Sequence, residues 1–456
     1  MRTREHLDAV IKAYDVRGVV GEDIDENFVR DTGAAFAAIL REEGENTVAV
    51  GHDMRPSSPS LARAFAEGVT SQGLNVTLLG LTSTDELYYA AGSLKCAGAM
   101  FTASHNPAKY NGIKLCRAGA VPVGQETGLE QIKQMLIDGT PEFTGTEGAI
   151  AEQEILAGYA DFLRKLVPLE ESKPLVVAVD AANGMGGHTV PAVFDGLPFD
   201  VRDLYFELDG TFPNHEANPL DPKNLVDLQK FTVDQKADIG LAFDGDADRC
   251  FVVDEKGQPV SPSAICALVA ERYLEKFPGA TIIHNLITSK TVPELIKEKG
   301  GTPVRTRVGH SFIKAVMAEE NGVFGGEHSA HYYFKDFFNA DTGMLAAMHV
   351  LAALGGSDEP LSEISAKYSP YVASGEINSE IEDKAAAVDR VRAHYANAPV
   401  VVEDSDGTTF TNTEEGWWVN LRPSNTEPFL RLNLEAPDVA TMERVRDEVL
   451  ALVRQG

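Results

Sequence analysis

A chain of 456 residues with 43% hydrophobic and 24% charged residues has the composition of a folded globular protein, and its length predicts three or four domains. Acidic residues outnumber basic ones 69 to 40, and the net charge of −29 disfavours nucleic acid and anionic membrane surfaces as partners. The same charge repels anionic substrates at long range, so a phosphate site must rest on locally clustered Arg, Lys and backbone N–H groups.

The cysteines and the apolar segments bear on the cellular compartment. The four cysteines have no CxxC spacing, which favours neither a zinc site nor a disulfide framework and fits a reducing cytoplasm. The N-terminal segment lacks the apolar run of a signal peptide, and the longest apolar stretch, near Met344–Leu354, is too short to span a bilayer. We therefore expect a cytoplasmic protein without a membrane segment.

Short apolar segments alternate with segments of helical period along most of the chain, which predicts α/β units. The first such unit contains a strand at 47–51, a helix at 60–72, and strands at 76–79 and 96–102. Further strands, each expected to lead through a polar turn into a helix, are predicted at 174–180, 238–243 and 280–285. A C-terminal region of different pattern ends in a helix predicted at 441–454.

Changes in composition along the chain suggest where domains end. A Gly/Thr/Glu-rich stretch at 138–148 precedes a helix predicted at about 151–166, and a turn at 254–262 separates a strand from the next helix. We expect four domains, the first three of α/β type, over residues 1–150, 151–253, 254–368 and 369–456.

The first candidate loop, Thr102–Pro107 (TASHNP), follows the apolar run GAMF at the end of a predicted strand. Side chains in such a loop are exposed, and the Asn-Pro pair breaks a helix, so Ser104 is placed where a nucleophile can be reached. A polar turn in which the serine only bonds the backbone is the common alternative.

The second loop, Asp244–Arg249 (DGDADR), follows another predicted strand. Asp244, Asp246 and Asp248 alternate along it, so their carboxylates can converge as the hard oxygen ligands that Mg²⁺ or Ca²⁺ prefers. The loop lacks the frame of an EF-hand, and a solvated acidic turn is the alternative. Arg249 favours the metal site, because a guanidinium beside a metal suits a transferring phosphoryl group.

The third loop, Gly325–His331 (GGEHSAH), also follows an apolar strand candidate. Glu327, Ser329 and His331 are spaced two residues apart and can reach the hydroxyls of one sugar ring. A zinc site at His328 and His331 is disfavoured, because the segment has no HExxH pattern and no third ligand at fixed spacing.

The fourth loop, Arg422–Pro428 (RPSNTEP), follows the segment WWVNL. An arginine followed by small polar residues in a turn gives a concave set of donors suited to a phosphate dianion, and a polar β-turn is the alternative. The Gly-rich segment 183–187 lacks the full GxGxxG spacing, so we expect a strand-to-helix turn there and no dinucleotide site.

In this order and spacing, the segments KAYDVRG, TASHNP with YNGIK, DGDADR, GEHSAH and RPSNTEP resemble the α-D-phosphohexomutase superfamily. Agreement among several separate loops, from about residue 12 to 428, is far more specific than any one of them. The resemblance implies four domains around a central cleft, three with mixed α/β sheets and a C-terminal α+β domain of the TATA-binding-protein-like group.

The resemblance also implies a covalent mechanism. In the family the serine that matches Ser104 is phosphorylated in the active enzyme, and Asp244, Asp246 and Asp248 match carboxylates that hold one Mg²⁺ with an oxygen of that phosphoserine. The phosphoserine donates to a hexose monophosphate, so a hexose 1,6-bisphosphate is both intermediate and activator. Arg249 matches a residue that offsets the charge of the transferred group.

By the same resemblance, the remaining residues serve proton transfer and substrate binding. Lys114 and His331 match candidates for the general base, and the choice between them stays open. The positions that match substrate contacts are Tyr14, Arg17, Lys290, Gly309, His310, Glu327, Ser329, His331, Arg422, Ser424, Asn425 and Thr426.

The expected substrates are mannose and glucose phosphates. These sugars differ only in configuration at C2, so a site that binds their other hydroxyls discriminates poorly between them. The motifs look most like those of bacterial phosphomannomutase/phosphoglucomutase, and a phosphoglucosamine mutase is the nearest alternative. A metal-dependent sugar phosphatase is disfavoured. Such enzymes have an aspartate followed two residues later by an acid–base aspartate and then by Thr or Val, whereas here Ala247 and Asp248 follow Asp246. A non-catalytic sugar-phosphate-binding protein is the last alternative, and we expect a monomer or a homodimer.

Overall fold

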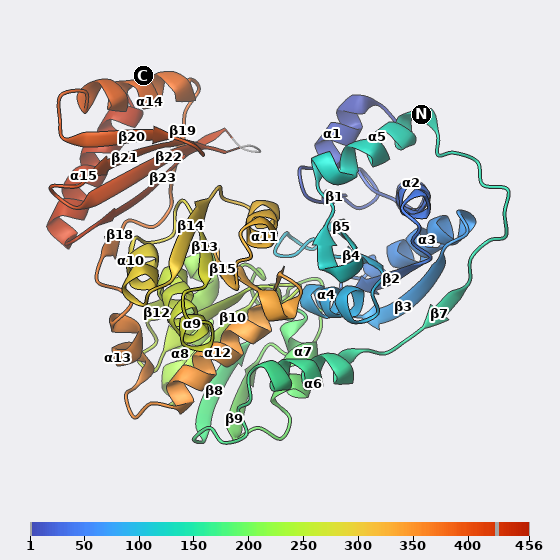
Figure 1. Cartoon of the computed structure of the whole chain (residues 1–456), viewed down its shortest axis with the longest axis horizontal. Helices are drawn as coiled ribbons and strands as arrows, with labels where there is room; N and C mark the ends of the chain where they lie inside the picture. The colour runs from blue at the N-terminus through green and yellow to red at the C-terminus, as the bar shows by residue number, and fades with distance from the viewer. Residues whose placement is uncertain (1, 425–427, 456) are drawn as a thin grey trace.

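The computed structural model describes residues 2–424 and 428–455, except the side chains of His310 and Ser311. Four β-sheets follow one another along the chain, and helices pack on each of them (Figure 1). The first three sheets mix parallel and antiparallel strands, and the fourth is antiparallel. The predicted arrangement of three α/β domains and a C-terminal α+β domain is therefore confirmed.

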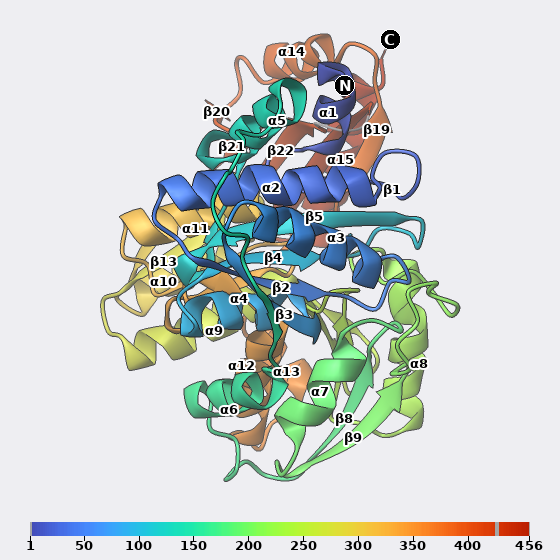
Figure 2. The same ribbon diagram turned by 90° about the vertical axis from the view of Figure 1, so that its right-hand side faces the viewer.

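The first sheet has the strand order β1-β5-β4-β2-β3-β7, with β6 beside β5. Its strands are β1 (Val16–Val19), β2 (Thr47–His52), β3 (Asn75–Leu81), β4 (Ala97–Phe101), β5 (Tyr110–Arg117), β6 (Val121–Pro122) and β7 (Ile150–Glu152). Its helices are α1 (Arg4–Val10), α2 (Glu26–Glu42), α3 (Ser58–Ser71), α4 (Thr84–Ser93) and α5 (Leu129–Asp138). α2 and α3 cover the outer face of the sheet, while α4 packs on the face turned toward the rest of the molecule (Figures 1 and 2).

The second sheet has the order β12-β11-β10-β8-β9. Its strands are β8 (Leu175–Asp180), β9 (Phe199–Leu204), β10 (Ile239–Phe243), β11 (Cys250–Asp254) and β12 (Pro259–Val260). Its helices are α6 (Leu156–Leu166), α7 (Gly186–Phe194) and α8 (Val226–Asp234).

Two predictions about this region are wrong. Residues 150–152 pair with β3 as an edge strand, so α6 begins at Leu156 and not at about 151. β10 leads through the loop 244–249 into the antiparallel strand β11, and not directly into a helix, although β11 is the strand predicted before the turn at 254–262. Both differences arise because pairing with a neighbouring strand overrides the local pattern.

The third sheet has the order β14-β13-β15-β16-β17. Its strands are β13 (Thr281–Asn285), β14 (Thr302–Thr306), β15 (Phe324–Gly326), β16 (Tyr332–Phe334) and β17 (Ala340–Asp341). The helices that follow in chain order are α9 (Pro262–Lys276), α10 (Thr291–Glu298), α11 (His310–Glu319), α12 (Gly343–Gly355) and α13 (Leu361–Ala366). One continuous hydrophobic core joins this sheet to the second, so the two units form one packed body.

The C-terminal sheet has the order β18-β23-β22-β21-β20, with β19 beside β23, and it has a hydrophobic core of its own. Its strands are β18 (Val372–Ala373), β19 (Ile377–Glu380), β20 (Val400–Asp404), β21 (Thr408–Asn412), β22 (Trp417–Pro423) and β23 (Phe429–Ala436). The helices α14 (Lys384–His394) and α15 (Val439–Val453) pack on this sheet.

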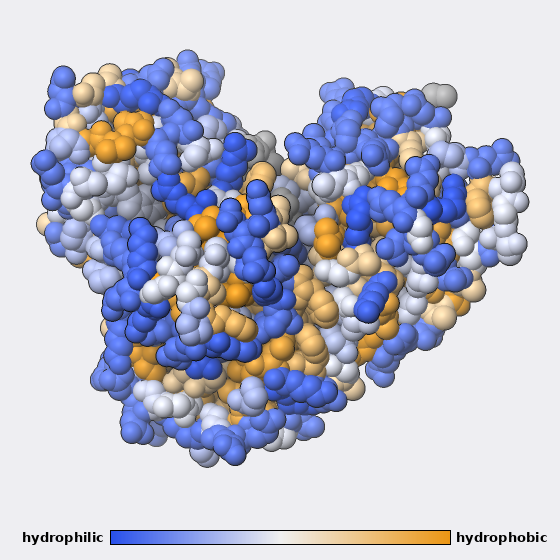
Figure 3. Space-filling model, in the orientation of Figure 1, coloured by the Kyte–Doolittle hydropathy of each residue, from blue (hydrophilic) through white to orange (hydrophobic). Residues whose placement is uncertain are grey.

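The first and last units form two lobes above the central body, and a notch separates them in the space-filling view (Figure 3). All four cysteines are buried thiols, and none forms a disulfide in the part of the chain that the structure describes. No helix among the described residues combines the length and the apolar character needed to cross a membrane.

Candidate active site

Ser104 lies in the loop after β4 with a φ of 50°, a left-handed conformation that L-residues seldom adopt. Its amide donates to Thr102 Oγ1 at 2.9 Å, which helps to hold this turn. Its hydroxyl donates to Asp244 Oδ2 at 3.0 Å and accepts from Arg249 Nη2 at 3.3 Å. The loop of the first unit thus presents its hydroxyl to a carboxylate and a guanidinium of the second unit.

The three aspartates of the loop between β10 and β11 converge. Asp244, Asp246 and Asp248 are buried, and one oxygen of each lies within 4.8 Å of the others. The Oδ1 atoms of Asp246 and Asp248 are buried and have no hydrogen-bond partner among the described residues. Burying such an oxygen without a partner is costly, so these atoms are suited to coordinate a cation. The residues present therefore fit a divalent metal with oxygen ligands.

Lys114 of β5 neutralises part of this cluster. Its Nζ donates to Asp246 Oδ2 at 2.7 Å and to Asp248 Oδ2 at 2.5 Å. Burial lowers the pKa of Lys114, but the two carboxylates outweigh burial and hold that pKa above its ordinary value. Lys114 is therefore a protonated partner of the carboxylates.

Arg249 folds back on the first aspartate of its own loop. Its Nε donates to Asp244 Oδ2 at 2.9 Å, and its Nη2 donates to His105 Nδ1 at 2.6 Å. Burial and the charge of Arg249 hold the pKa of His105 well below its ordinary value, so this imidazole is neutral. Burial raises the pKa of Asp244 to about 8, which is an electrostatic cost that a bound cation would remove.

The loop after β15 brings its polar side chains beside the aspartates. His331 Nε2 lies 3.8 Å from Asp248 Oδ1, and His331 Nδ1 is 3.1 Å from Ser329 Oγ. Glu327 is 1% exposed, and its carboxylate accepts from Asn285 Nδ2 at 3.1 Å and from the Tyr333 hydroxyl at 2.7 Å. Both carboxylate oxygens of Glu327 thus accept hydrogen bonds from other residues of the protein, while His331 Nε2 lies toward the aspartate carboxylates.

Tyr14 lies where the first, third and fourth units approach one another. Its ring meets that of Phe312 edge to face at 6.4 Å, and its hydroxyl lies 3.3 Å from the position that a Cβ on Gly309 would take. Burial raises the pKa of Tyr14, and the negative charges of Asp406 and Glu327 raise it further. Gly309, with a φ of 134° at the start of α11, therefore leaves space beside this ring.

Arg17 and Lys290 contact different parts of the site. Arg17 Nη1 donates to Asn106 Oδ1 at 2.6 Å, which ties β1 to the loop of Ser104. Lys290 Nζ donates to the Gly416 carbonyl at 2.6 Å, so it lies at the junction of the third and fourth units.

The C-terminal loop carries a cationic cluster. Arg422 of β22 stands opposite Arg431 of β23, and Arg431 Nη2 donates to Ser424 Oγ at 3.4 Å. The Arg422 Nε is buried and finds no hydrogen-bond partner within residues 2–424 and 428–455. Two guanidinium groups beside a hydroxyl suit an anion. The predictions at Asn425 and Thr426, and that for the His310 side chain, lie outside the described part of the structure.

Two residues of the site were missed by the sequence analysis. Thr84 Oγ1 donates to Asp246 Oδ2 at 2.6 Å, and Arg55 Nη2 donates to the Ser104 carbonyl at 3.0 Å. The one usable signal is that Arg55 follows a predicted strand. If that strand lies parallel to the strand that ends near residue 102, as it does in this sheet, the residues after both strands meet at the same edge. Nothing in the sequence around Thr84 indicates its partner.

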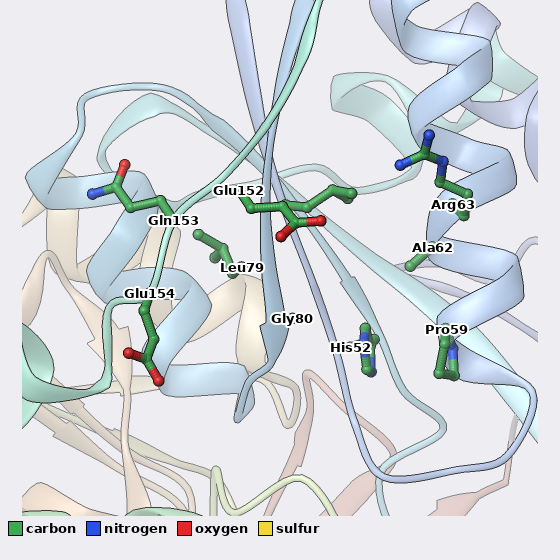
Figure 4. Close-up of a pocket in the computed structure, with 10 residues that line it drawn as sticks. His52, Pro59, Ala62, Arg63, Leu79, Gly80, Glu152, Gln153 and Glu154 are labelled. Carbon is green, nitrogen blue, oxygen red and sulfur yellow. The ribbon is translucent and has the colours of Figure 1, made fainter.

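A separate hollow of about 470 Å³ lies on the first unit, between β2, β3, α3 and the segment after β7 (Figure 4). Its polar lining includes His52, Arg63, Glu152 and Glu154. None of the described residues predicted for the site lines it, so the hollow is distinct from the cluster around Ser104.

Comparison with known families agrees with this arrangement. Four models of the phosphoglucomutase/phosphomannomutase family match in order: alpha/beta/alpha domain I at residues 8–141, domain II at 157–257, domain III at 261–371 and the C-terminal domain at 376–452. The chain belongs to this family and is an enzyme.

Individual relatives are similar over nearly the whole chain. A phosphomannomutase from Salmonella montevideo is 38% identical over 452 residues, which cover 97% of this chain and 98% of the relative. A protein described as phosphohexose mutases, from Xanthomonas campestris pv. campestris, is 38% identical over 446 residues with the same coverage. The crystal structure of a phosphoglucomutase/phosphomannomutase family protein from Burkholderia thailandensis, 30% identical, superposes with a TM-score of 0.89 and covers 98% of this chain and 97% of that chain.

Proposed function

We propose that this chain interconverts hexose 1-phosphates and hexose 6-phosphates through a phosphorylated Ser104. The observation that carries the proposal is the contact of the Ser104 hydroxyl with Asp244 and Arg249, beside buried carboxylate oxygens that have no partner in the described chain. Phosphoryl transfer needs a positioned oxygen and preorganised positive charge, and this arrangement supplies both.

Asp244, Asp246 and Asp248 would hold one Mg²⁺, with Ser104 as a further ligand. Three carboxylates and a hydroxyl-derived oxygen are the donor set that this hard cation prefers. When bound, Mg²⁺ would offset negative charge on the transferred phosphoryl group.

The first half-reaction moves a phosphoryl group from Ser104 to a hydroxyl of the bound hexose monophosphate. The bond from phosphorus to the serine oxygen breaks as the bond to the sugar oxygen forms. A base takes the proton of the sugar hydroxyl, and the departing serine oxygen takes up a proton, which restores the Ser104 hydroxyl. In the second half-reaction the other phosphoryl group of the hexose 1,6-bisphosphate returns to Ser104. The added bisphosphate would therefore act as an activator, because it phosphorylates enzyme that has lost the group.

His331 is the better candidate for the base. Lys114 is engaged with two carboxylates, which raise its pKa, and a lysine held protonated is a poor base near neutral pH. His331 Nδ1 is oriented by Ser329, and Nε2 is left toward the reacting region near Asp248. Arg249, within reach of Ser104 Oγ, would stabilise charge on the transferred group and on the serine oxygen.

The distal phosphate would bind at Arg422 and Ser424, and the sugar hydroxyls at Ser329 and Glu327. We propose mannose and glucose phosphates as substrates, as the names of the similar proteins suggest for mannose. A cytoplasmic location fits four buried cysteines that form no disulfide among the described residues.

A coupled assay tests this function. The chain is given mannose 1-phosphate or glucose 1-phosphate with Mg²⁺ and glucose 1,6-bisphosphate, and formation of the 6-phosphate is followed. Intact-mass measurement should find one acid-stable phosphoryl group, lost in Ser104→Ala together with turnover. Ser104→Ala should still bind the sugar phosphate in a calorimetric titration, since the remaining polar groups are unchanged.

The outcomes separate the alternatives. Near-normal turnover by Ser104→Ala would exclude the covalent route. Release of inorganic phosphate without isomerisation would indicate a phosphatase, and turnover of glucosamine phosphate alone would indicate a phosphoglucosamine mutase with the same mechanism.

A further inference from the structure

Arg55 is a fully buried arginine directly after β2, outside the set of residues assigned above to substrate or metal. Its side chain is 0% exposed, and all five N–H donors of its guanidinium have acceptors. The acceptors are Asp53 Oδ2 at 3.1 Å and the carbonyls of Ser104 at 3.0 Å, Asn106 at 2.7 Å, Pro107 at 2.9 Å and Tyr110 at 3.0 Å.

Four of these acceptors are backbone carbonyls of one loop, the segment 104–110. The Pro107 carbonyl also accepts from the Tyr110 amide at 3.0 Å, and Tyr110 begins β5. The carbonyls of Ser104 and Asn106 lie in the bend between β4 and β5, where burying them unpaired would cost free energy. Arg55 thus donates hydrogen bonds to the carbonyls of this loop, as the amides of a neighbouring strand donate to the carbonyls of β4. The planar guanidinium also fixes the directions in which the carbonyls point.

The second unit closes over this arrangement. The Phe212 ring lies 5.0 Å from Arg55 Cζ, and a Cβ on Gly210 would fall 2.5 Å from Arg55 Cα. On the other side of the loop, a Cβ on Gly245 would fall 2.4 Å from the Ser104 carbonyl oxygen. The Ser104 carbonyl is therefore held between Arg55 and the glycine of the aspartate loop.

We propose that Arg55 is a positioning residue that holds the Ser104 loop in register with the aspartate loop. Without it the left-handed conformation of Ser104 loses one of its two described supports, the other being the bond of its amide to Thr102, and the hydroxyl shifts relative to Asp244. This role rests on the proposed function, because it gives Ser104 the part of nucleophile. A lysine keeps the charge but cannot reach four carbonyls at once from a single ammonium.

The test is Arg55→Lys in the full chain. A misplacement of about 1 Å costs on the order of 100-fold in rate, so we expect kcat to fall about 100-fold while KM for glucose 1-phosphate stays within about threefold. The rate at which glucose 1,6-bisphosphate phosphorylates Ser104, followed by intact mass, should fall by a similar factor. A merely structural defect would not split kcat from KM in this way.

Arg164→Lys is the matched control. Arg164 also donates to backbone carbonyls, those of Ala192 at 2.8 Å and Val193 at 3.3 Å, but far from the site. Its kcat and KM should both remain near those of the unchanged chain. Hydrogen exchange should rise in the segment 104–110 only in Arg55→Lys.

The two proposals fail in distinguishable ways. The proposed function would be refuted if the chain without substitutions had no mutase activity. If hydrogen exchange in Arg55→Lys were then still faster in 104–110 alone, the positioning role would be supported. Unchanged kcat or unchanged exchange in a folded Arg55→Lys would overturn the positioning role. If Arg55→Lys does not fold, Asp53→Asn is tested in its place, because it weakens the acceptor of Arg55 Nε. The same measurements apply with a smaller expected effect, and the same outcomes would contradict the proposal.

Discussion

In the aspartate triplet, the hydrogen bonds made by one oxygen of a carboxylate orient the other oxygen of the same carboxylate. Asp246 Oδ2 accepts from Thr84 Oγ1 at 2.6 Å and from Lys114 Nζ at 2.7 Å, while Oδ1 is buried with no partner in the described ranges. The occupied oxygen fixes the rotation of the carboxylate, so the other is aimed before any cation arrives. Groups behind a ligand commonly tune metal affinity in this way.

Thr84→Val should therefore weaken metal binding. Loss of an orienting partner costs about 10- to 100-fold in affinity, and valine keeps the shape of threonine while removing the donor. The measurement is the dissociation constant for Mn²⁺, obtained from the signal of free Mn²⁺ in electron paramagnetic resonance, with no substrate present.

Thr84→Ser serves as the control, because it restores the hydroxyl and loses only a methyl group. Its Mn²⁺ affinity should lie close to that of the unchanged chain. Equal affinity in Thr84→Val would mean that Lys114 alone orients Asp246.

At the residue scale, the sequence pointed to the proposed reacting groups better than to the residues that contact them. Ser104 and the aspartates stand in short motifs whose residue types suggest the roles proposed for them. Thr84 and Arg55 contact partners 162 and 49 residues away. The sequence around Thr84 does not indicate its partner, and the only signal for Arg55 is its place after a predicted strand. Only the packing of the units against one another brings them to the site.

The N-terminus of α4 is an element that joins three units. Ser83 caps the helix, Thr84 contacts the second unit, and Asp85 accepts from the hydroxyls of Tyr159 on α6 and Thr342 before α12, each at 2.6 Å. Asp85 is fully buried, and burial raises its pKa to about 7. One carboxylate thus links the first, second and third units.

This carboxylate should make stability depend on pH. Its folded-state pKa is about 7, against about 4 when unfolded, so the folded state binds a proton that the unfolded state releases in that range. Its contribution is fully present below about pH 4 and is lost as pH rises through about 7. We expect Asp85→Asn, which cannot titrate, to show a smaller fall in melting temperature than the unchanged chain between pH 5 and about 7.5.

Differential scanning calorimetry at several pH values in this range measures the effect. Asp161→Asn on α6 is the control, because it makes the same substitution at a side chain that is 61% exposed and contacts Arg164 at the surface. Parallel curves for Asp85→Asn and the unchanged chain would contradict the assignment.

At the scale of elements, the sequence predicted the strands that consist of a run of apolar residues followed by a polar turn. β2, β3, β4, β8, β10 and β13 lie within about two residues of their predicted ranges. Except in β3, which is only partly buried, burial on both faces of the sheet produces continuous apolar runs. β7 was missed because it is three residues long, and its partner β3 lies far back in the chain. Short edge strands depend on pairing, which local sequence does not encode.

At the scale of the molecule, the C-terminal unit is a body with its own core that is attached to the third unit by polar contacts. Lys290 Nζ donates to the Gly416 carbonyl at 2.6 Å, and the Val308 amide donates to Asp406 Oδ2 at 3.0 Å. In a chain with a net charge of −29, Arg422 and Arg431 of this unit form a local group of positive charge that can bind an anion. Substrate binding should therefore depend on this unit more than the chemical step does.

Arg422→Ala tests whether the C-terminal unit contributes to substrate binding more than to the chemical step. A hydrogen bond to a charged group contributes about 1.5–3 kcal/mol, so its loss should raise KM for glucose 1-phosphate at least about tenfold, with a smaller fall in kcat. Steady-state kinetics measures both, and Arg444→Ala, which removes an arginine that is 52% exposed on α15 of the same unit, should change neither. If Arg422→Ala lowered kcat and left KM unchanged, this arginine would act on the transferred phosphoryl group, and the C-terminal unit would have to approach Ser104 during the chemical step.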